Sequence, residues 1–234
     1  MRRDRPLHVM RILKFGSIAL LVLGVACQAT SKAELSSANR PANLNISAWE
    51  SSRDAATKAE ATSDKQEKAR LAKEGIELAE QCIMTQPEDA ACYYYRAINT
   101  GIYYEAHVVG YQNGLMSMIK DCEKTISLDE RFDHGGAYRI LGKIYTEVPE
   151  TTFVKNGVSR DLEKAVAYLE KAVQLDSGYP ENYIYLADAQ YELGRKKEAL
   201  TSLSNSISLV PQWENHNDYA LWQRLNKELS NKLK

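Results

Sequence analysis

Small and apolar residues recur at helical spacing through the second half of the chain. The clearest series has intervals of three and four residues, with charged residues between its members: Leu162, Ala165, Val166, Leu169, Ala172 and Val173. This spacing places the series on one face of a helix. Pro180 then occupies the favoured first turn of a second helix, which Gly194 interrupts, and residues 197–209 form its partner. The pattern predicts pairs of amphipathic helices joined by tight turns.

Helical periodicity extends over residues 46–234, where the alternation typical of strands is nearly absent. Two short helices cannot bury their apolar faces alone, so pairs of this kind stack on one another. The final segment, residues 218–234, carries leucines at helical spacing among many charges, which is typical of a terminal cap. We therefore predict an all-α solenoid of about three to four helix pairs with a C-terminal capping helix.

The last helix pair resembles the tetratricopeptide repeat, a helix–turn–helix unit of about 34 residues. The matching residues are Tyr183, Leu186, Ala187, Gly194, Ala199 and Pro211. The preceding pair matches at Tyr138, Leu141, Gly142, Tyr145, Ala165, Leu169 and Ala172, with a longer turn, and a weaker third pair has an insertion at residues 111–114 in its connection. The resemblance implies a tetratricopeptide-like fold that binds a protein or peptide.

The N-terminal segment has a different pattern. Basic residues precede an uncharged apolar run at residues 15–26. The run is too short to span a bilayer, which takes roughly 20 residues, and a basic segment followed by a short apolar one is typical of a secretory signal. We expect residues 1–26 to be this signal. Residues 28–45, rich in Ser, Ala and Asn, are expected to form a flexible tether to the helical domain of residues 46–234.

The end of the apolar run resembles the lipobox of bacterial lipoproteins, since the small residue Ala26 directly precedes Cys27. In that family the cysteine is acylated and becomes the new N-terminus, which implies lipidation of Cys27 and a periplasmic protein anchored to the membrane. Gln28, in place of Asp, favours the outer membrane. The alternative is an ordinary signal that is cleaved just past Cys27.

Beyond residue 26 the chain has 25 Lys and Arg against 30 Asp and Glu, a net charge of −5. Nucleic-acid binding depends on neutralising phosphates with basic residues, so this balance argues against a nucleic-acid partner. The chain also lacks a polybasic patch for anionic lipid. Membrane attachment is therefore expected only through the lipid on Cys27.

Motifs of the common enzyme classes are absent from the sequence. It has no GxGxxG before a helix, no P-loop, no HExxH and no GxSxG, and its cysteines and histidines lack metal-binding spacing. His134 lies in the string Asp133-His-Gly-Gly, whose glycines allow close backbone approach but fit better as the start of the helix that contains Tyr138. We expect a non-catalytic protein without a cofactor or metal.

The repeat register places six residues on the concave side of the array, where a partner would bind: Tyr94, Arg139, Lys143, Ile184, Asp188 and Tyr191. Tyr94 would supply apolar area with a hydroxyl group, and Arg139 and Lys143 would pair a carboxylate of the partner. The alternatives are packing between repeats for Tyr94 and a solvated helix face for the two cations. The primary hypothesis is an envelope scaffold that presents this groove to a protein or peptide.

A longer series of residues is similar to the T-component of TRAP transporters: residues 133–142, Tyr145, Pro149, the long turn and residues 165–172. T-components are periplasmic lipoproteins of helical pairs around a pore or cleft, and they associate with a solute-binding protein. The resemblance implies an alternative function as an accessory that binds an apolar solute. Tyr103, Tyr104 and Val108 lie on a predicted helix that is apolar nearly all round and would line the cavity, although core packing explains the same pattern.

Three cysteines follow Cys27, namely Cys82, Cys92 and Cys122. An oxidising compartment permits one disulfide among them and leaves one thiol over. The alternative is that all three are small core residues, because they lie on apolar helix faces. The sequence leaves both possibilities open.

Overall fold

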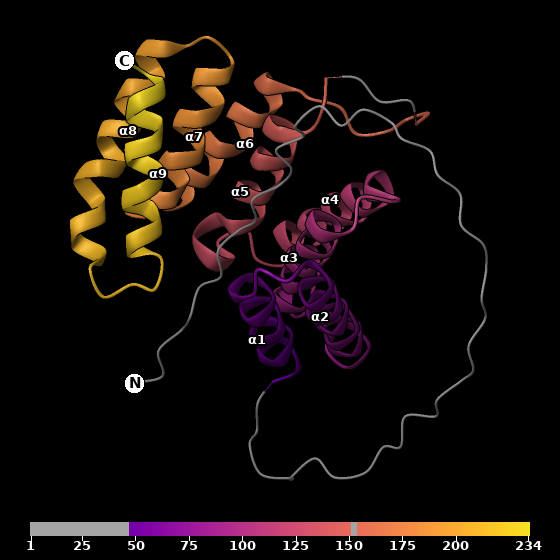
Figure 1. Cartoon of the computed structure of the whole chain (residues 1–234). Helices are drawn as coiled ribbons and strands as arrows, with labels where there is room; N and C mark the ends of the chain where they lie inside the picture. Colours follow the sequence, from indigo (N-terminus) through magenta and orange to yellow (C-terminus); the bar gives the residue numbers. More distant parts are fainter. Residues whose placement is uncertain (1–46, 151–153) are drawn as a thin grey trace.

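The computed structural model describes residues 47–150 and 154–234, and every regular element in these residues is helical (Figure 1). The helices are α1 (Ala48–Ala61), α2 (Lys65–Thr85), α3 (Ala90–Ala106), α4 (Tyr111–Leu128), α5 (Phe132–Glu147), α6 (Leu162–Leu175), α7 (Pro180–Glu192), α8 (Lys196–Leu209), the 3₁₀ helix η1 (Val210–Trp213) and α9 (Tyr219–Lys232). The all-α prediction is therefore confirmed. The predicted signal, the tether and Cys27 lie outside the described residues.

Side chains at the first turns define where several helices begin. Asp64, Asp89 and Asp161 each precede a helix, and a carboxylate oxygen of each accepts a backbone N–H of the first turn at 2.8–3.1 Å. These bonds satisfy donors that have no partner inside the helix. Pro180 begins α7, as predicted, because its missing N–H costs nothing at the first position.

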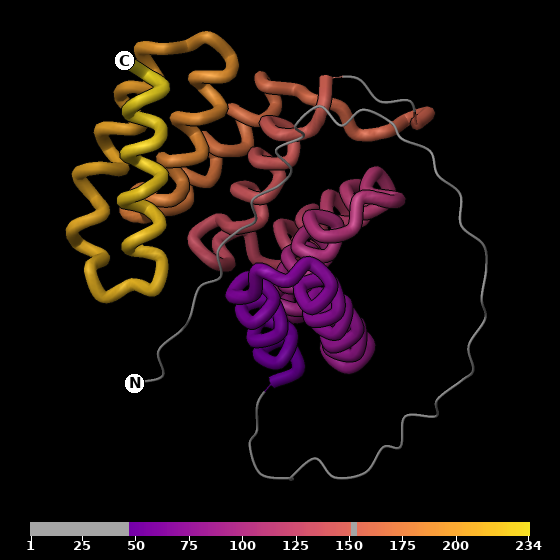
Figure 2. Tube along the Cα trace, in the orientation of Figure 1, coloured from indigo at the N-terminus to yellow at the C-terminus, as the bar shows by residue number. Residues whose placement is uncertain are grey.

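The helices form a solenoid of antiparallel pairs, which the trace in Figure 2 follows from α1/α2 through α3/α4, α5/α6 and α7/α8. Odd-numbered helices also contact one another in sequence, from α1 to α9. The single helix α9 packs against both α7 and α8 at the end of the array, the place predicted for the capping helix.

Small residues allow the helices to approach closely, as the repeat pattern predicts. Ala165, Ala172, Ala187 and Ala199 are fully buried. A Cβ atom on Gly142 of α5 would overlap the side chain of Leu169 of α6. The small residues therefore occupy the crossing points of the last two pairs.

The connection between α3 and α4 differs from the prediction. Residues 111–114 are the first turn of α4 and not an insertion, and α3 ends at Ala106. Val108 and Val109 lie in the turn between the two helices and are 52% and 79% exposed. The apolar run continues past the end of the helix, so the periodicity alone overestimated its length.

A disulfide joins Cys82, near the end of α2, to Cys92, in the first turn of α3. Cys122 remains a free thiol in the core. The question that the sequence left open is thus answered by a pairing within the N-terminal half.

We predict that reduction of this disulfide destabilises the fold. Closing a loop of this size lowers the conformational entropy of the unfolded chain, which stabilises the folded state by about 2–3 kcal/mol. Chemical denaturation should show a free energy of unfolding lower by this amount in reductant. The double variant Cys82→Ala/Cys92→Ala should start from the lower value and show no response to reductant. Equal stability of the wild type in both conditions would contradict the prediction.

Candidate functional site

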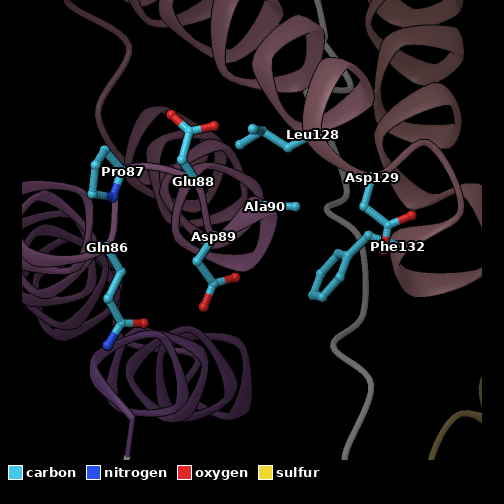
Figure 3. A pocket seen from close by; sticks show the side chains of 8 residues that line it. All are labelled: Gln86, Pro87, Glu88, Asp89, Ala90, Leu128, Asp129 and Phe132. Carbon is cyan, nitrogen blue, oxygen red and sulfur yellow. The ribbon is translucent and has the colours of Figure 1, made fainter.

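An open pocket of about 520 Å³ lies between the α2–α3 turn and the α4–α5 turn. Its lining residues are Gln86, Pro87, Glu88, Asp89, Ala90, Leu128, Asp129 and Phe132. Figure 3 shows Gln86 and Pro87 on one side of the pocket and Phe132 on the other, with Ala90 between them. Three carboxylates and several apolar groups thus share one hollow. This combination suits a basic side chain with an apolar stem, such as Lys or Arg.

Backbone hydrogen bonds hold two of the pocket carboxylates in place. Asp89 Oδ1 accepts the N–H of Ala91 at 2.9 Å, and Asp129 Oδ1 accepts the N–H of Arg131 at 2.9 Å. Asp89 directly precedes α3 and Asp129 directly follows α4, so each bond fixes an aspartate within the turn between two helices. Glu88 is exposed at the rim. The negative charge of the pocket is therefore positioned by the turns themselves.

An aromatic cluster supports the apolar side of the pocket. The Phe132 ring lies edge-on to Tyr94 and Tyr95 of α3, with centroids 5.2 and 6.2 Å away. Tyr95 in turn stacks on Trp49 of α1 at 5.6 Å. Edge-to-face and stacked pairs favour fixed ring positions. The wall formed by Phe132 is thus held by rings from α1 and α3.

The three residues that follow Phe132 form a left-handed turn inside the first part of α5. Asp133, His134 and Gly135 have φ values of 50°, 59° and 78°. For a residue other than glycine this conformation costs roughly 1–2 kcal/mol, so the contacts around Asp133 and His134 must compensate. The predicted role of the Asp133-His-Gly-Gly string, shaping the start of the helix, agrees with this turn.

Contacts from α3, α6 and α7 hold the left-handed turn. The Tyr94 hydroxyl donates to Asp133 Oδ2, and a Cβ atom on Gly136 would overlap that hydroxyl. Asn182 Nδ2 donates to the carbonyl of His134 at 3.0 Å. The His134 ring stacks on Tyr179 at 4.2 Å, and its Nδ1 lies 2.7 Å from Asp176 Oδ2. The turn is therefore fixed by residues distant in sequence.

A fully buried arginine links the turn to the next repeat. Arg139 Nη2 donates to Asp133 Oδ2 at 2.6 Å, and its Nε lies 3.0 Å from Glu181 Oε2 of α7. Arg139 Nη1 also donates to Asn182 Oδ1 at 3.0 Å. Arg139 and Glu181 are both 0% exposed. A buried charge of this kind is tolerated only when it is paired and hydrogen-bonded.

Burial shifts the pKa values of several residues around Arg139 and at the far end of α5. It raises the pKa of Glu181, and the nearby charge of Arg139 opposes this rise. Burial, reinforced by the charge of Asp133, raises the pKa of Tyr94 well above its usual value. At the other end of α5, burial raises the pKa of Glu147 to about 7, opposed by Lys143. Tyr94 therefore stays protonated and acts as a donor.

Four of the six predicted groove residues are buried, which contradicts the expectation that they face an open groove. Tyr94, Arg139, Lys143 and Ile184 are at most 6% exposed. The left-handed turn contacts both Tyr94 and Arg139, and the start of α7 contacts Arg139 as well. Lys143 lies over the Tyr185 ring at 4.2 Å and 3.5 Å from Glu147 Oε1.

Asp188 and Tyr191 are the two groove residues that keep partial exposure. Asp188 Oδ1 accepts a hydrogen bond from Lys232 Nζ of α9 at 2.9 Å, and the same ammonium group lies 6.0 Å from the Tyr191 ring. The structure therefore does not bring the six residues together as one surface.

Tyr103, Tyr104 and Val108 do not enclose the predicted apolar cavity. The two tyrosines are half-exposed, with rings edge-on at 5.1 Å, and Val108 lies in the exposed turn after α3. None of the three lines the pocket between the turns. This arrangement does not favour the binding of an apolar solute at these residues.

Within residues 47–150 and 154–234, no group of three or more His, Cys, Asp or Glu side chains is arranged to hold a metal ion. In the same part of the chain, none of the helices combines the length and apolar character needed to cross a membrane.

Sequence analysis missed the pocket and the partners of Arg139. The pocket residues lie in turns that follow second helices of repeats, and acidic residues recur there: Glu88 and Asp89, Asp129 and Glu130, and Asp176. Comparing the turns with one another would have shown this signal. No local signal marks Glu181 and Asn182, because their role depends on contacts with residues more than 40 positions away.

Residues 159–222 match the family model of the tetratricopeptide repeat. The match spans α6, α7, α8 and the start of α9. No curated protein sequence matches the chain. Together with the helical pairs, the family match shows a tetratricopeptide-like α-solenoid, and repeats of this family generally serve as non-catalytic scaffolds for protein interactions.

We predict that Arg139→Leu destabilises the protein by about 3–5 kcal/mol at pH 7, because the fully buried Glu181 and the partly buried Asp133 would keep their charges without a counter-ion. The destabilisation caused by Arg139→Leu should be smaller at pH 5 than at pH 7. Without Arg139 the pKa of Glu181 rises further, so protonation at the lower pH removes the unpaired charge. Denaturant unfolding at both pH values measures the effect.

Arg195→Leu is the matched control, since Arg195 pairs with Glu163 at the surface and its loss should cost less than about 1 kcal/mol. Adding Glu181→Gln to Arg139→Leu should restore part of the stability at pH 7. Similar small losses of stability for Arg139→Leu and Arg195→Leu would show that the buried pair of Arg139 and Glu181 does not hold α5 against α7.

Proposed function

We propose that the protein is a non-catalytic scaffold that binds a protein partner in the cell envelope and is anchored there by a lipid on Cys27. The observation that carries the binding function is the tetratricopeptide match at residues 159–222 within a continuous solenoid. We further propose that the pocket between the α2–α3 and α4–α5 turns receives a basic side chain of the partner. Glu88, Asp89 and Asp129 would pair its charge, and Phe132 would contact its stem.

Two features support the proposed location. The basic and apolar pattern of residues 1–26, followed by Cys27, is that of a lipoprotein signal. The Cys82–Cys92 disulfide is of the kind that persists in oxidising compartments such as the periplasm.

We predict that peptides selected from a random display library on the immobilised full chain contain Lys or Arg next to apolar residues. Glu88→Gln/Asp129→Asn should weaken their binding by about fivefold, since each rim charge contributes under about 1 kcal/mol. Asn at position 129 keeps the oxygen that accepts the N–H of Arg131. Binding measured by fluorescence anisotropy should also weaken as salt is raised.

Glu77→Gln/Glu214→Gln is the matched control, because it removes the same charge from exposed positions outside the pocket. The control should bind the selected peptides like the wild type. Selection of peptides without basic residues, or equal weakening in both double variants, would reject the pocket as the binding site.

We predict that wild-type protein sediments with the membranes of fractionated cells and that Cys27→Ala moves it to the soluble fraction. Acyl chains on Cys27 would provide the hydrophobic anchor, and the variant cannot carry them. Cys122→Ala, which removes a buried thiol, should stay with the membranes. Unchanged sedimentation of Cys27→Ala would overturn the lipid anchor while leaving the binding function untouched.

A further inference from the structure

Helices α6 and α8 are the second helices of the last two pairs and carry the same apolar pattern. At a shift of 34 residues, Val166 corresponds to Leu200, Leu169 to Leu203 and Val173 to Ile207. Intervals of three and four residues place each set of three on one helix face, which we call the outer stripe. The two outer stripes differ in what covers them.

On α6 the outer stripe holds the first helix of the next pair. Val166 is 2% exposed and belongs to one apolar cluster with Leu186 and Ala189 of α7. Val173 packs against the same cluster. The outer stripe is therefore the surface through which this solenoid adds a following helix.

On α8 the outer stripe is only partly covered. Leu203 is buried against Leu229 of α9 and Leu233 directly after it, whereas Leu200 and Ile207 are 45% and 48% exposed. Figure 1 shows α8 at the outer edge of the array, with α9 along one side of it. The capping helix thus covers the middle position and leaves the two ends of the stripe open.

From Leu200 to the end of η1 the surface around the open positions carries no charge, and the nearest charges on this face of α8 are Lys196 and Lys197, one turn before Leu200. Residues 200–213 include no Asp, Glu, Lys or Arg, although charged residues make up 26% of the chain. The exposed residues of α8 between and beside Leu200 and Ile207 are the uncharged Thr201, Ser204, Asn205 and Ser208, whereas the exposed Lys196 and Lys197 lie only at the Leu200 end. The residue of α6 that corresponds to Ser204 is the exposed Glu170. The α8 surface is therefore unlike the solvated outer surface of α6.

We propose that the outer stripe of α8 binds the same stripe of a second copy of this chain, in a two-fold symmetric dimer. A two-fold axis sets a surface against itself, so a charged surface would repel its copy and an uncharged one does not. With the two α8 helices antiparallel, Leu200 of each copy faces Ile207 of the other. Ser204 lies near the axis, where a small side chain allows close approach.

Helix α1, at the other end of the array, is not complementary to the outer stripe of α8. The accessible residues of α1 include Arg53, Asp54 and Lys58. A head-to-tail contact would place these charges against Leu200 and Ile207, at a desolvation cost without compensation. The self-complementary α8 pairing is therefore favoured over an open chain of copies.

The dimer should be weak. One pair of helices buries less than the ~800 Å² per partner of a standard interface. We therefore expect a dissociation constant of micromolar order for the full chain in detergent, measured by sedimentation equilibrium. Leu200→Glu/Ile207→Glu should raise it at least about tenfold. Because both side chains are exposed in one copy, the variant should unfold at the same denaturant concentration as the wild type.

A cysteine near the axis gives an independent test. Under mild oxidation, Ser204→Cys should form a covalent dimer, and adding Leu200→Glu/Ile207→Glu should abolish it. Glu170→Cys, at the corresponding exposed position of α6, should give no more dimer than the wild-type chain run in parallel. Wild-type protein that remains monomeric throughout the micromolar range would overturn the proposal, and so would equal cross-linking of both cysteine variants. Either result would also be expected if a different protein, and not a second copy, bound to α8.

Discussion

The pairing of Arg139 with Asp133 and Glu181 is the contact on which the middle of the solenoid depends. Its three charges come from the left-handed turn, from the body of α5 and from the first turn of α7. Because Arg139 and Glu181 are fully buried and Asp133 is partly buried, the two carboxylates are tolerable at these positions only while the guanidinium is present. The pairing keeps Asp133 in its unfavourable backbone conformation, and that conformation sets the direction in which α5 leaves the α4–α5 turn. The stacking of the later helices and the position of Phe132 both follow from it.

The repeat pattern was sufficient to predict the all-α fold and the helix pairs of the second half of the chain. Ala165, Ala172, Ala187 and Ala199 mark crossing points that only small residues permit, and Pro180 marks where α7 begins. These are local properties of the sequence, so a single chain displays them. The 34-residue register also assigned six residues to the inner side of the array. It could not show whether the inner side is open, since covering Arg139 depends on Asn182, which is 43 residues away.

The left-handed turn could not be predicted from the local sequence. Asp133 and His134 disfavour this conformation intrinsically, and contacts with Tyr94, Arg139, Asp176, Tyr179 and Asn182 stabilise it. The pocket raises the same difficulty, because its two walls come from turns separated by a whole helix pair. Each turn on its own is an ordinary acidic connection between repeats. The pocket exists because the α2–α3 turn and the α4–α5 turn lie beside each other, and the stacking of the helix pairs determines that arrangement.

The Cys82–Cys92 disulfide has a consequence for the pocket wall. Residues 86–90, which form that wall, lie between the two half-cystines, so they belong to a small covalent ring. Most of the conformational freedom of this wall is removed when the ring closes, before any partner arrives. If a partner binds at this pocket as proposed, it meets a preorganised surface and does not have to order that surface on binding. In a reducing environment the same wall would open into a longer, adaptable loop, so the oxidation state of one covalent bond would set how selectively the pocket discriminates among guests.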